Sequence, residues 1–306
     1  MRTYAFFCMH QDKTGVTGSI GAFDDSWKIR AHEARQNYYA VGAPTNQIMM
    51  SFKNQWEVYR RFLGAAQALG LRSLEPGSGR GSISCYFAAA GFDAYLLDTS
   101  AEILRVAEDI FRENGLSARF VCADCLAMPF PDGFFDTVVH CGLLEHFEDY
   151  RAPLVEQWRV LKPGGVIIAT IVPEKRSVQT LFSFVNRGLA AVHRVLARIG
   201  MVRSVGKEEK KSLYRSSHGS SPYVAALTAL GARIEYQGGI FPVPSFSYSP
   251  AFPFTLMPRP IERALVFLWS GVLVLRRLLW PRRHPWMCSE KWGQHVLVVA
   301  RKPLSV

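Results

Sequence analysis

The sequence predicts an α/β fold built on a mainly parallel sheet. From Leu71 onward, short apolar runs alternate with helical stretches, which is the pattern of βαβ units. Glycines at 91, 115 and 164–165 end these stretches, as helix C-terminal signals do. Of the 306 residues, 49% are hydrophobic and 20% are charged, so the chain can bury a large core.

The apolar periodicity predicts each element in turn. Before Leu71 we expect two helices, one from a cap at 24–26 to about Tyr39 and one over 52–69. The expected strands and helices of the middle region are strands at 71–75, 94–98, 118–122, 135–140 and 166–172, and helices at 81–90, 101–114 and 153–161. Later elements are a basic amphipathic stretch at 178–199, helices at 222–230 and 261–280, and strands at 232–237 and 295–300. Five prolines between 240 and 258 exclude a continuous helix there.

The positive charge is confined to one region. Between Glu174 and Glu290 there are 17 Lys and Arg against 6 Asp and Glu, which accounts for the whole net charge of +11. Such asymmetry indicates a partner surface, either a membrane or a nucleic acid. Six cysteines are too few for a disulfide scaffold, and the N-terminus lacks the apolar run of a signal peptide. We therefore expect a cytoplasmic chain with free thiols.

A glycine-rich loop follows the first expected strand. Gly77, Gly79 and Gly81 let the backbone approach a ligand and turn into a helix whose N-terminal N–H groups face it. Alone, the loop also fits a dinucleotide-binding fold or a tight turn without a ligand. A G-x-G-x-x-G fingerprint counted from Gly77 requires Gly or Ala at position 82, which is Ser82, so the loop argues against NAD.

Carboxylates follow the next two strands. Asp98 ends the second strand, where an acidic residue can accept the hydroxyls of a ribose. Asp124 follows the third strand and can accept a hydrogen bond from the amine of adenine. Each alone is also typical of a solvated loop or a helix cap. Together with the glycine loop and the LKPGG turn before the fifth strand, they indicate one nucleoside-containing cofactor.

The motifs LEPGSGRG, YLLD, ADCLAMPFPDGFFD, LLEHFED and RVLKPGG, in this order, resemble those of class I S-adenosylmethionine (SAM)-dependent methyltransferases. The similarity is to the subgroup of ubiquinone-biosynthesis and small-molecule enzymes. It implies a Rossmann-like, seven-stranded, mainly parallel sheet with an antiparallel last strand, N-terminal helices and a helical cap insertion. The expected divisions are a helical lid at 1–70, a SAM-binding core at 71–173, a basic apolar cap at 174–290 and the last core strand at 291–306.

The resemblance also implies roles for individual residues. The region around Glu75, Gly77 and Gly79 would surround the methionine part of SAM, Asp98 the ribose, and Asp124 with the Cys125 backbone the adenine. The residues after the fourth strand would lie near the sulfonium. The complete set of expected cofactor contacts is Glu75, Gly77, Ser78, Gly79, Asp98, Thr99, Asp124, Cys125, Cys141 and Gly142.

Three further features have both a functional and a structural interpretation. His146 is either a general base for an acceptor hydroxyl or a packing residue. Tyr38 and Tyr39 either contact the substrate from a lid or face the core. Cys122 and Cys125 lack a second pair at zinc spacing, so no metal is expected.

We expect methyl transfer to a small, lipophilic or lipid-linked acceptor, with O-methylation slightly favoured over C or N. The alternatives are a SAM-fold binding or scaffold protein without catalysis, and a nucleic-acid methyltransferase. Nucleic acid is disfavoured because the arginines are interleaved with aliphatic rather than aromatic residues. Residues 178–199 and 261–283 combine apolar and basic faces, which fits either an anionic membrane surface at the inner face of a membrane or a substrate-binding cap.

Overall fold

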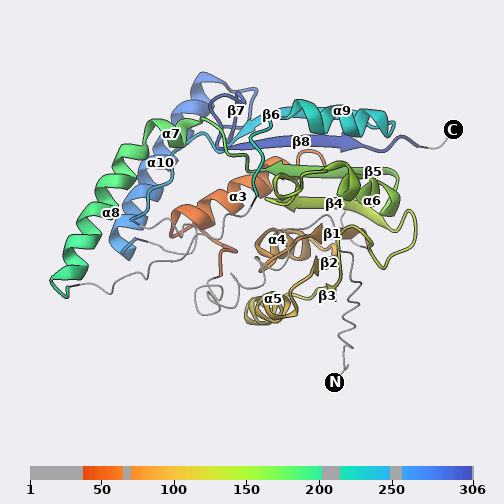
Figure 1. Cartoon of the computed structure of the whole chain (residues 1–306), viewed down its shortest axis with the longest axis horizontal. Coiled ribbons are helices and arrows are strands. Elements are labelled where there is room, and N and C mark those ends of the chain that lie inside the picture. Colours follow the sequence, from red (N-terminus) through yellow and green to blue (C-terminus); the bar gives the residue numbers. More distant parts are fainter. Residues whose placement is uncertain (1–36, 65–69, 202–213, 249–256, 305–306) are drawn as a thin grey trace.

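A computed structural model describes residues 37–64, 70–201, 214–248 and 257–304. Its centre is a sheet with the strand order β3-β2-β1-β4-β5-β8-β6-β7 (Figure 1). The strands are β1 (Arg72–Pro76), β2 (Asp93–Asp98), β3 (Arg119–Cys122), β4 (Phe135–Cys141), β5 (Leu161–Ile171), β6 (Arg233–Ile240), β7 (Met287–Cys288) and β8 (His295–Arg301).

The topology confirms the predicted α/β fold. Strands β1 to β5 run parallel, and β8 pairs antiparallel with both β5 and β6. The strands expected as six and seven are β6 and β8. The two-residue β7, antiparallel to β6, adds an eighth strand to the expected seven. It was missed because two residues are too short for a periodic pattern.

Helices cover both faces of the sheet. α6 and α9 pack on one face and α3, α4 and α5 on the other, while α10 packs against α3. The helices are α3 (Gln47–Tyr59), α4 (Ser82–Ala89), α5 (Ala101–Glu113), the 3-10 turn η1 (Leu144–His146), α6 (Arg151–Val160), α7 (Val178–Leu181), α8 (Ser183–Arg198), α9 (Ser221–Ala229) and α10 (Arg259–Leu279).

Several sequence-based boundaries were wrong, and α3 was the most displaced. It begins five residues before the expected Phe52, because the Asn46 side chain accepts hydrogen bonds from the N–H groups of Ile48 and Met49. It also ends ten residues before the expected Leu69. The expected helix ending at Tyr39 lies mostly outside the described residues, and 37–40 are not helical.

Two other expectations need correction. The stretch at 178–199 is not one helix, because it breaks at Phe182 into α7 and α8. The LKPGG segment is not a turn before the fifth strand, because β5 begins at Leu161 and includes it. Gly165 fits there because a Cβ would lie 2.8 Å from the Leu161 side chain.

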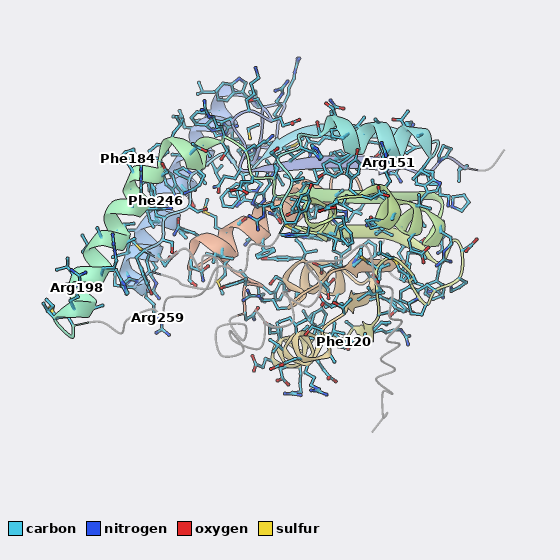
Figure 2. All side chains as sticks on the ribbon, in the orientation of Figure 1. Phe120, Arg151, Phe184, Arg198, Phe246 and Arg259 are labelled. Carbon is cyan, nitrogen blue, oxygen red and sulfur yellow. The ribbon has the colours of Figure 1, made fainter. Side chains whose placement is uncertain are left out.

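A two-helix arm, formed by α8 and α10, extends away from the sheet (Figure 1). Residues 245–248 join its helices: Asn186 of α8 donates to the Ser245 carbonyl, and Phe246 contacts Trp269 of α10. Figure 2 shows Phe184, Arg198 and Arg259 on this arm, far from Arg151 at the opposite end of the molecule. Among the described helices, none has both the length and the apolar character to cross a membrane.

Buried Glu262 attaches the arm to the rest of the fold. This residue of α10 is 2% exposed and accepts hydrogen bonds from the backbone N–H of Gln47, the first residue of α3, and from Met257. A carboxylate suits this place because the first N–H groups of a helix have no partners within the helix. Together with the Asn46 cap, this contact stabilises the early start of α3, and it holds α10 against that helix.

Candidate functional site

The glycine loop connects β1 to α4 as predicted. Gly77, Gly79 and Gly81 all have positive φ, of 64°, 51° and 70°. A Cβ on Gly77 would lie 2.7 Å from a methyl group of Leu143, and one on Gly81 would collide with Leu96. The turn therefore requires glycine both for its backbone conformation and for its close packing.

Asp98 joins this loop at the carboxyl edge of the sheet. Its Oδ2 accepts from the N–H of Gly79 at 2.9 Å, and its Oδ1 accepts from the N–H of Ser100 at 3.0 Å. The N–H of Ser78 donates to the Leu97 carbonyl at 3.1 Å. The structure thus places the expected ribose-binding carboxylate beside the glycine loop and holds it in a defined orientation.

Glu75 lies behind the loop and is 6% exposed. Its Oε2 accepts from the N–H of Ser84 at 3.0 Å and from the Ser84 hydroxyl at 2.5 Å. Burial raises the pKa of Glu75 to about 8, the Ser84 hydrogen bonds oppose this shift, and nearby Asp98 adds to it. A cationic group bound nearby would favour the charged form of this carboxyl.

The loop after β3 meets the same edge. The N–H of Ala123 donates to the Asp98 carbonyl, and the Asp124 carboxylate accepts from the N–H of Leu126 at 2.9 Å. The Cys125 side chain packs into the core, and Thr99 accepts at its carbonyl from the Cys122 thiol. In the described part of the chain, no three His, Cys, Asp or Glu side chains group as a metal site would need.

Cys141 ends β4 at the centre of the edge, and Gly142 follows it. The N–H of Gly142 donates to the carbonyl of Thr170 in the neighbouring strand β5, which fixes the position of the loop that follows β4. Fully buried Glu145 accepts from the N–H of Val172 at 3.1 Å, while its second carboxylate oxygen has no partner among the described residues. Burial raises the pKa of Glu145 to about 7.

His146 is held by the backbone. Its Nδ1 donates to the Tyr214 carbonyl at 2.8 Å, and its side chain is 8% exposed. Burial lowers its pKa to about 4, an effect that the Tyr214 contact opposes and Arg215 strengthens. Its burial and its hydrogen bond to the backbone fit the packing interpretation, and its catalytic role stays a prediction.

Tyr38 and Tyr39 lie close to the glycine loop. The Arg80 guanidinium lies 4.5 Å from the centre of the buried Tyr38 ring, and the Tyr39 ring meets Tyr86 of α4 edge-on at 4.8 Å. The expected substrate tyrosines are therefore packed on the loop and its helix. Their contact with an acceptor stays a prediction.

A buried polar cluster under α3 was not predicted. The Tyr59 hydroxyl lies 2.6 Å from the Thr170 hydroxyl, and Gln55 Nε2 donates to His295 Nδ1 at 3.3 Å. Gln55 also hydrogen-bonds the Cys141 thiol. These residues come from α3, β4, β5 and β8. The signal available in the sequence was Gln55, which lies four residues after Ser51 and four before Tyr59, so that these polar groups share one face of α3.

The comparisons with known proteins agree with this geometry. Residues 74–169 match the family described as a methyltransferase domain, and this range contains the glycine loop, Asp98, Asp124 and the β4 turn. Residues 74–169 therefore form a methyltransferase domain. Its cofactor is SAM. The buried Ser78 hydroxyl in the glycine loop has no partner among the described residues, which fits a ligand with polar groups at this position.

Two relatives are curated quinone-biosynthesis enzymes. This chain is 29% identical over 201 residues to the ubiquinone/menaquinone biosynthesis C-methyltransferase UbiE of Pectobacterium atrosepticum, covering 62% of this chain and 76% of that one. It is 33% identical over 143 residues to the ubiquinone biosynthesis O-methyltransferase of Methylococcus capsulatus, covering 46% and 54%. The chain spans about half the length of most of the first curated relatives that it matches.

A solved structure shares the fold over almost the whole chain. The [4+2]-cyclase SpnF is 17% identical, with a TM-score of 0.56, and the alignment covers 95% of this chain and 98% of that one. At this identity the likeness concerns the fold alone.

Proposed function

We propose that this chain transfers a methyl group from SAM to a small, lipophilic acceptor of quinol type. The observation that carries the proposal is the hydrogen bond between Gly79 of the glycine loop and Asp98 at the carboxyl edge of the sheet, within the matched methyltransferase domain. The names of the two curated relatives point to quinone precursors as acceptors. Since one is named a C-methyltransferase and the other an O-methyltransferase, we retain O-methylation as the favoured reaction only on the sequence-based expectation.

The proposed cofactor contacts are those expected from the sequence. A carboxylate has about four acceptor sites, so Asp98 can accept hydrogen bonds from ribose hydroxyls as well as from its protein partners. The Ser78 hydroxyl and the loop N–H groups would face the methionine part, with Glu75 behind them. Asp124 and the Cys125 backbone would bind adenine, and Thr99, Cys141 and Gly142 would complete the site.

The chemistry of the step is largely supplied by the cofactor. When bound, SAM provides a methyl group already activated on a positively charged sulfur. The protein must hold the acceptor in line and exclude water, and positioning of this kind contributes about 7–11 kcal/mol. The buried polar cluster under α3 supports a water-excluding site at this edge. Its members lie beside Cys141 and are surrounded by apolar side chains; they are Gln55, Tyr59, Thr170 and His295.

The location we infer is the cytoplasmic side of a membrane, with the chain bound peripherally. A lipophilic acceptor would be found there, and the arm exposes apolar side chains together with arginines. Whether residues 174–290 also cap the acceptor stays a prediction, as does the absence of nucleic-acid binding.

Calorimetry with S-adenosylhomocysteine, followed by incubation with SAM and a prenylated hydroxyquinol, tests the proposal. We expect binding, then a product heavier by one methyl group whose position by NMR distinguishes O- from C-methylation. A soluble phenol serves as the non-lipophilic comparison. Failure to bind at millimolar concentration overturns the enzyme proposal, and binding without product from any acceptor favours the scaffold alternative.

A further inference from the structure

The outer face of α10 is apolar. Its exposed positions Ala264, Phe267, Leu268, Gly271, Val274, Leu275 and Leu278 follow the 3-4 spacing of one helix face. Phe267 is 83% exposed and Leu278 is 74% exposed. The buried residues Glu262, Trp269 and Leu273 lie on the opposite face. An ordinary surface helix turns its polar face outward, so α10 has a second apolar face that its own packing does not use.

α8 has the same character. None of its described residues is buried, and its exposed apolar residues are Phe184, Val192 and Val195, continued by Ile199 after the helix. Its other side turns toward residues 245–248, where Asn186 contacts Ser245 and the His193 ring stacks on Tyr248 at 4.3 Å. The two helices of the arm therefore both expose apolar faces.

Arginines follow the edges of these faces. Arg187, Arg194 and Arg198 lie along one edge of α8, at spacings of seven and four residues. Arg259, Arg263 and Arg277 lie on one edge of α10, and Arg282 and Arg283 follow it. In the described parts of the chain, none of these eight arginines forms an ion pair with an acidic residue.

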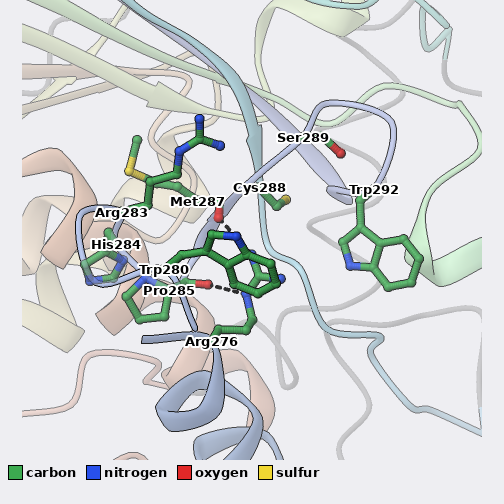
Figure 3. Close-up of a pocket in the computed structure, with 9 residues that line it drawn as sticks. All are labelled: Arg276, Trp280, Arg283, His284, Pro285, Met287, Cys288, Ser289 and Trp292. Carbon is green, nitrogen blue, oxygen red and sulfur yellow. Dashed lines mark hydrogen bonds between the residues drawn. The ribbon is translucent and has the colours of Figure 1, made fainter. Parts of the chain in front are cut away.

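Arg276 differs from its neighbours because it is used inside the fold. It donates to the carbonyls of Pro285 and Met287, both at 2.9 Å, and its guanidinium lies 5.5 Å from the Trp280 ring (Figure 3). It lines a cavity of about 260 Å³ beside β7, an edge strand that four other strands separate from β1 and its glycine loop. Arg276 therefore holds the segment after α10 in place, and the arginines available to a partner are the others.

We propose that the outer faces of α8 and α10 lie in the interface of an anionic phospholipid membrane, with the apolar side chains among the acyl chains and the arginines at the phosphates. A lipid surface satisfies both features at once. A second copy of the chain would cover the apolar faces but would bring two sets of unpaired arginines together. This surface deepens the proposed membrane location, and its binding to lipid does not require methyl transfer.

The test is co-sedimentation of the full chain with vesicles of phosphatidylcholine alone or of phosphatidylcholine mixed with phosphatidylglycerol, since each basic residue near an anionic surface contributes about 1 kcal/mol. No SAM or acceptor is present, so failure here leaves the methyltransferase proposal standing. We expect binding only to the anionic vesicles, with slower hydrogen exchange in 183–198 and 259–279. The basic variant R277Q/R282Q/R283Q should bind at least tenfold more weakly, and so should the apolar variant F184S/F267S/L278S.

Control variants carry the same kinds of substitution outside α8 and α10. R105Q/R112Q/R151Q removes three arginines, and V41S/V155S replaces exposed apolar residues, all away from the arm. Both should bind as the wild type does. Equal loss in the controls, unchanged binding by the apolar variant, or a dimer in sedimentation velocity that protects α8 and α10 without vesicles would each overturn the proposal. Every variant is first compared with the wild type by circular dichroism.

Discussion

The core and the arm use the same kinds of residue in opposite ways. In the sheet, Val138, Ile167 and Val298 are fully buried between layers of helices, whereas Phe267 and Leu278 of α10 face outward. Both regions show the periodicity of amphipathic or buried elements in the sequence. The difference shows that periodicity identifies an apolar face but does not state what covers it.

The largest expected effect tests the packing of the core loop. Gly81→Ala adds a Cβ at φ +70° that collides with Leu96, so we expect a loss of about 3 kcal/mol in the free energy of unfolding. Gly115→Ala is the control, since its φ is +65° but no atom lies within 4 Å of the added Cβ. It should lose only ~1 kcal/mol. Urea denaturation measures both, and equal losses would contradict the close packing of the loop.

Asp98→Asn tests whether Asp98, beside the glycine loop, binds the cofactor. Removal of the charge should weaken S-adenosylhomocysteine binding by about 10- to 100-fold, since hydrogen bonds to charged groups contribute ~1.5–3 kcal/mol. Asp93→Asn changes the other end of the same strand, where the carboxylate pairs with Arg119, and should leave affinity unchanged. An unchanged affinity in Asp98→Asn, measured by calorimetry, would remove this residue from the proposed site.

Glu75 predicts a pH dependence of core stability without cofactor. The pKa of Glu75 in the folded chain, about 8, lies above its ordinary value of 4.5, so between these values the unfolded chain loses a proton that the folded chain keeps. The contribution of Glu75 to the free energy of unfolding is complete below pH 4.5. It falls as the pH rises to about 8, by at most ~1.4 kcal/mol per pH unit. Urea unfolding from pH 5 to 8 should show a flatter profile in Glu75→Gln. Glu145 remains in both proteins, so the difference isolates Glu75.

Tyr59→Phe tests the buried cluster under α3. Loss of the contact with Thr170 should cost ~1 kcal/mol of stability and reduce kcat/KM for the acceptor several-fold. Tyr223→Phe, on the other face of the sheet, removes a similar contact with Ser216. It should cost the same stability and leave kcat/KM unchanged. Equal activities in the two variants would make the cluster purely structural.

The smallest expected effect is on the arm. Phe267→Ser should change the free energy of unfolding by less than ~0.5 kcal/mol, because the side chain is already exposed to solvent. Val138→Ala in the core should cost about 2–3 kcal/mol. A large loss in Phe267→Ser would show that the outer face of α10 packs against the chain itself, and thermal and urea unfolding of the two variants decide this.

Local and sequential signals predicted most of the candidate site. The positive φ of Gly77 and Gly79 and the positions of Asp98 and Asp124 after their strands depend on neighbouring residues and strand order, which the sequence displays directly. The cluster of Gln55, Tyr59, Thr170 and His295 could not be predicted, because its members are up to 240 positions apart. The early start of α3 depends on Glu262, which is 215 positions away from Gln47.

By itself, the sequence determined the sheet core, the glycine turn and the basic character of residues 174–290, since each follows from local conformation, periodicity or composition. Only the tertiary structure decided which face of each helix is buried. α3 was expected to be one more apolar helix and instead covers the edge with buried polar groups. α10 was expected to be a hydrophobic helix, and one of its two faces points outward. The opposite face, which carries Glu262, Trp269 and Leu273, is buried against the rest of the chain.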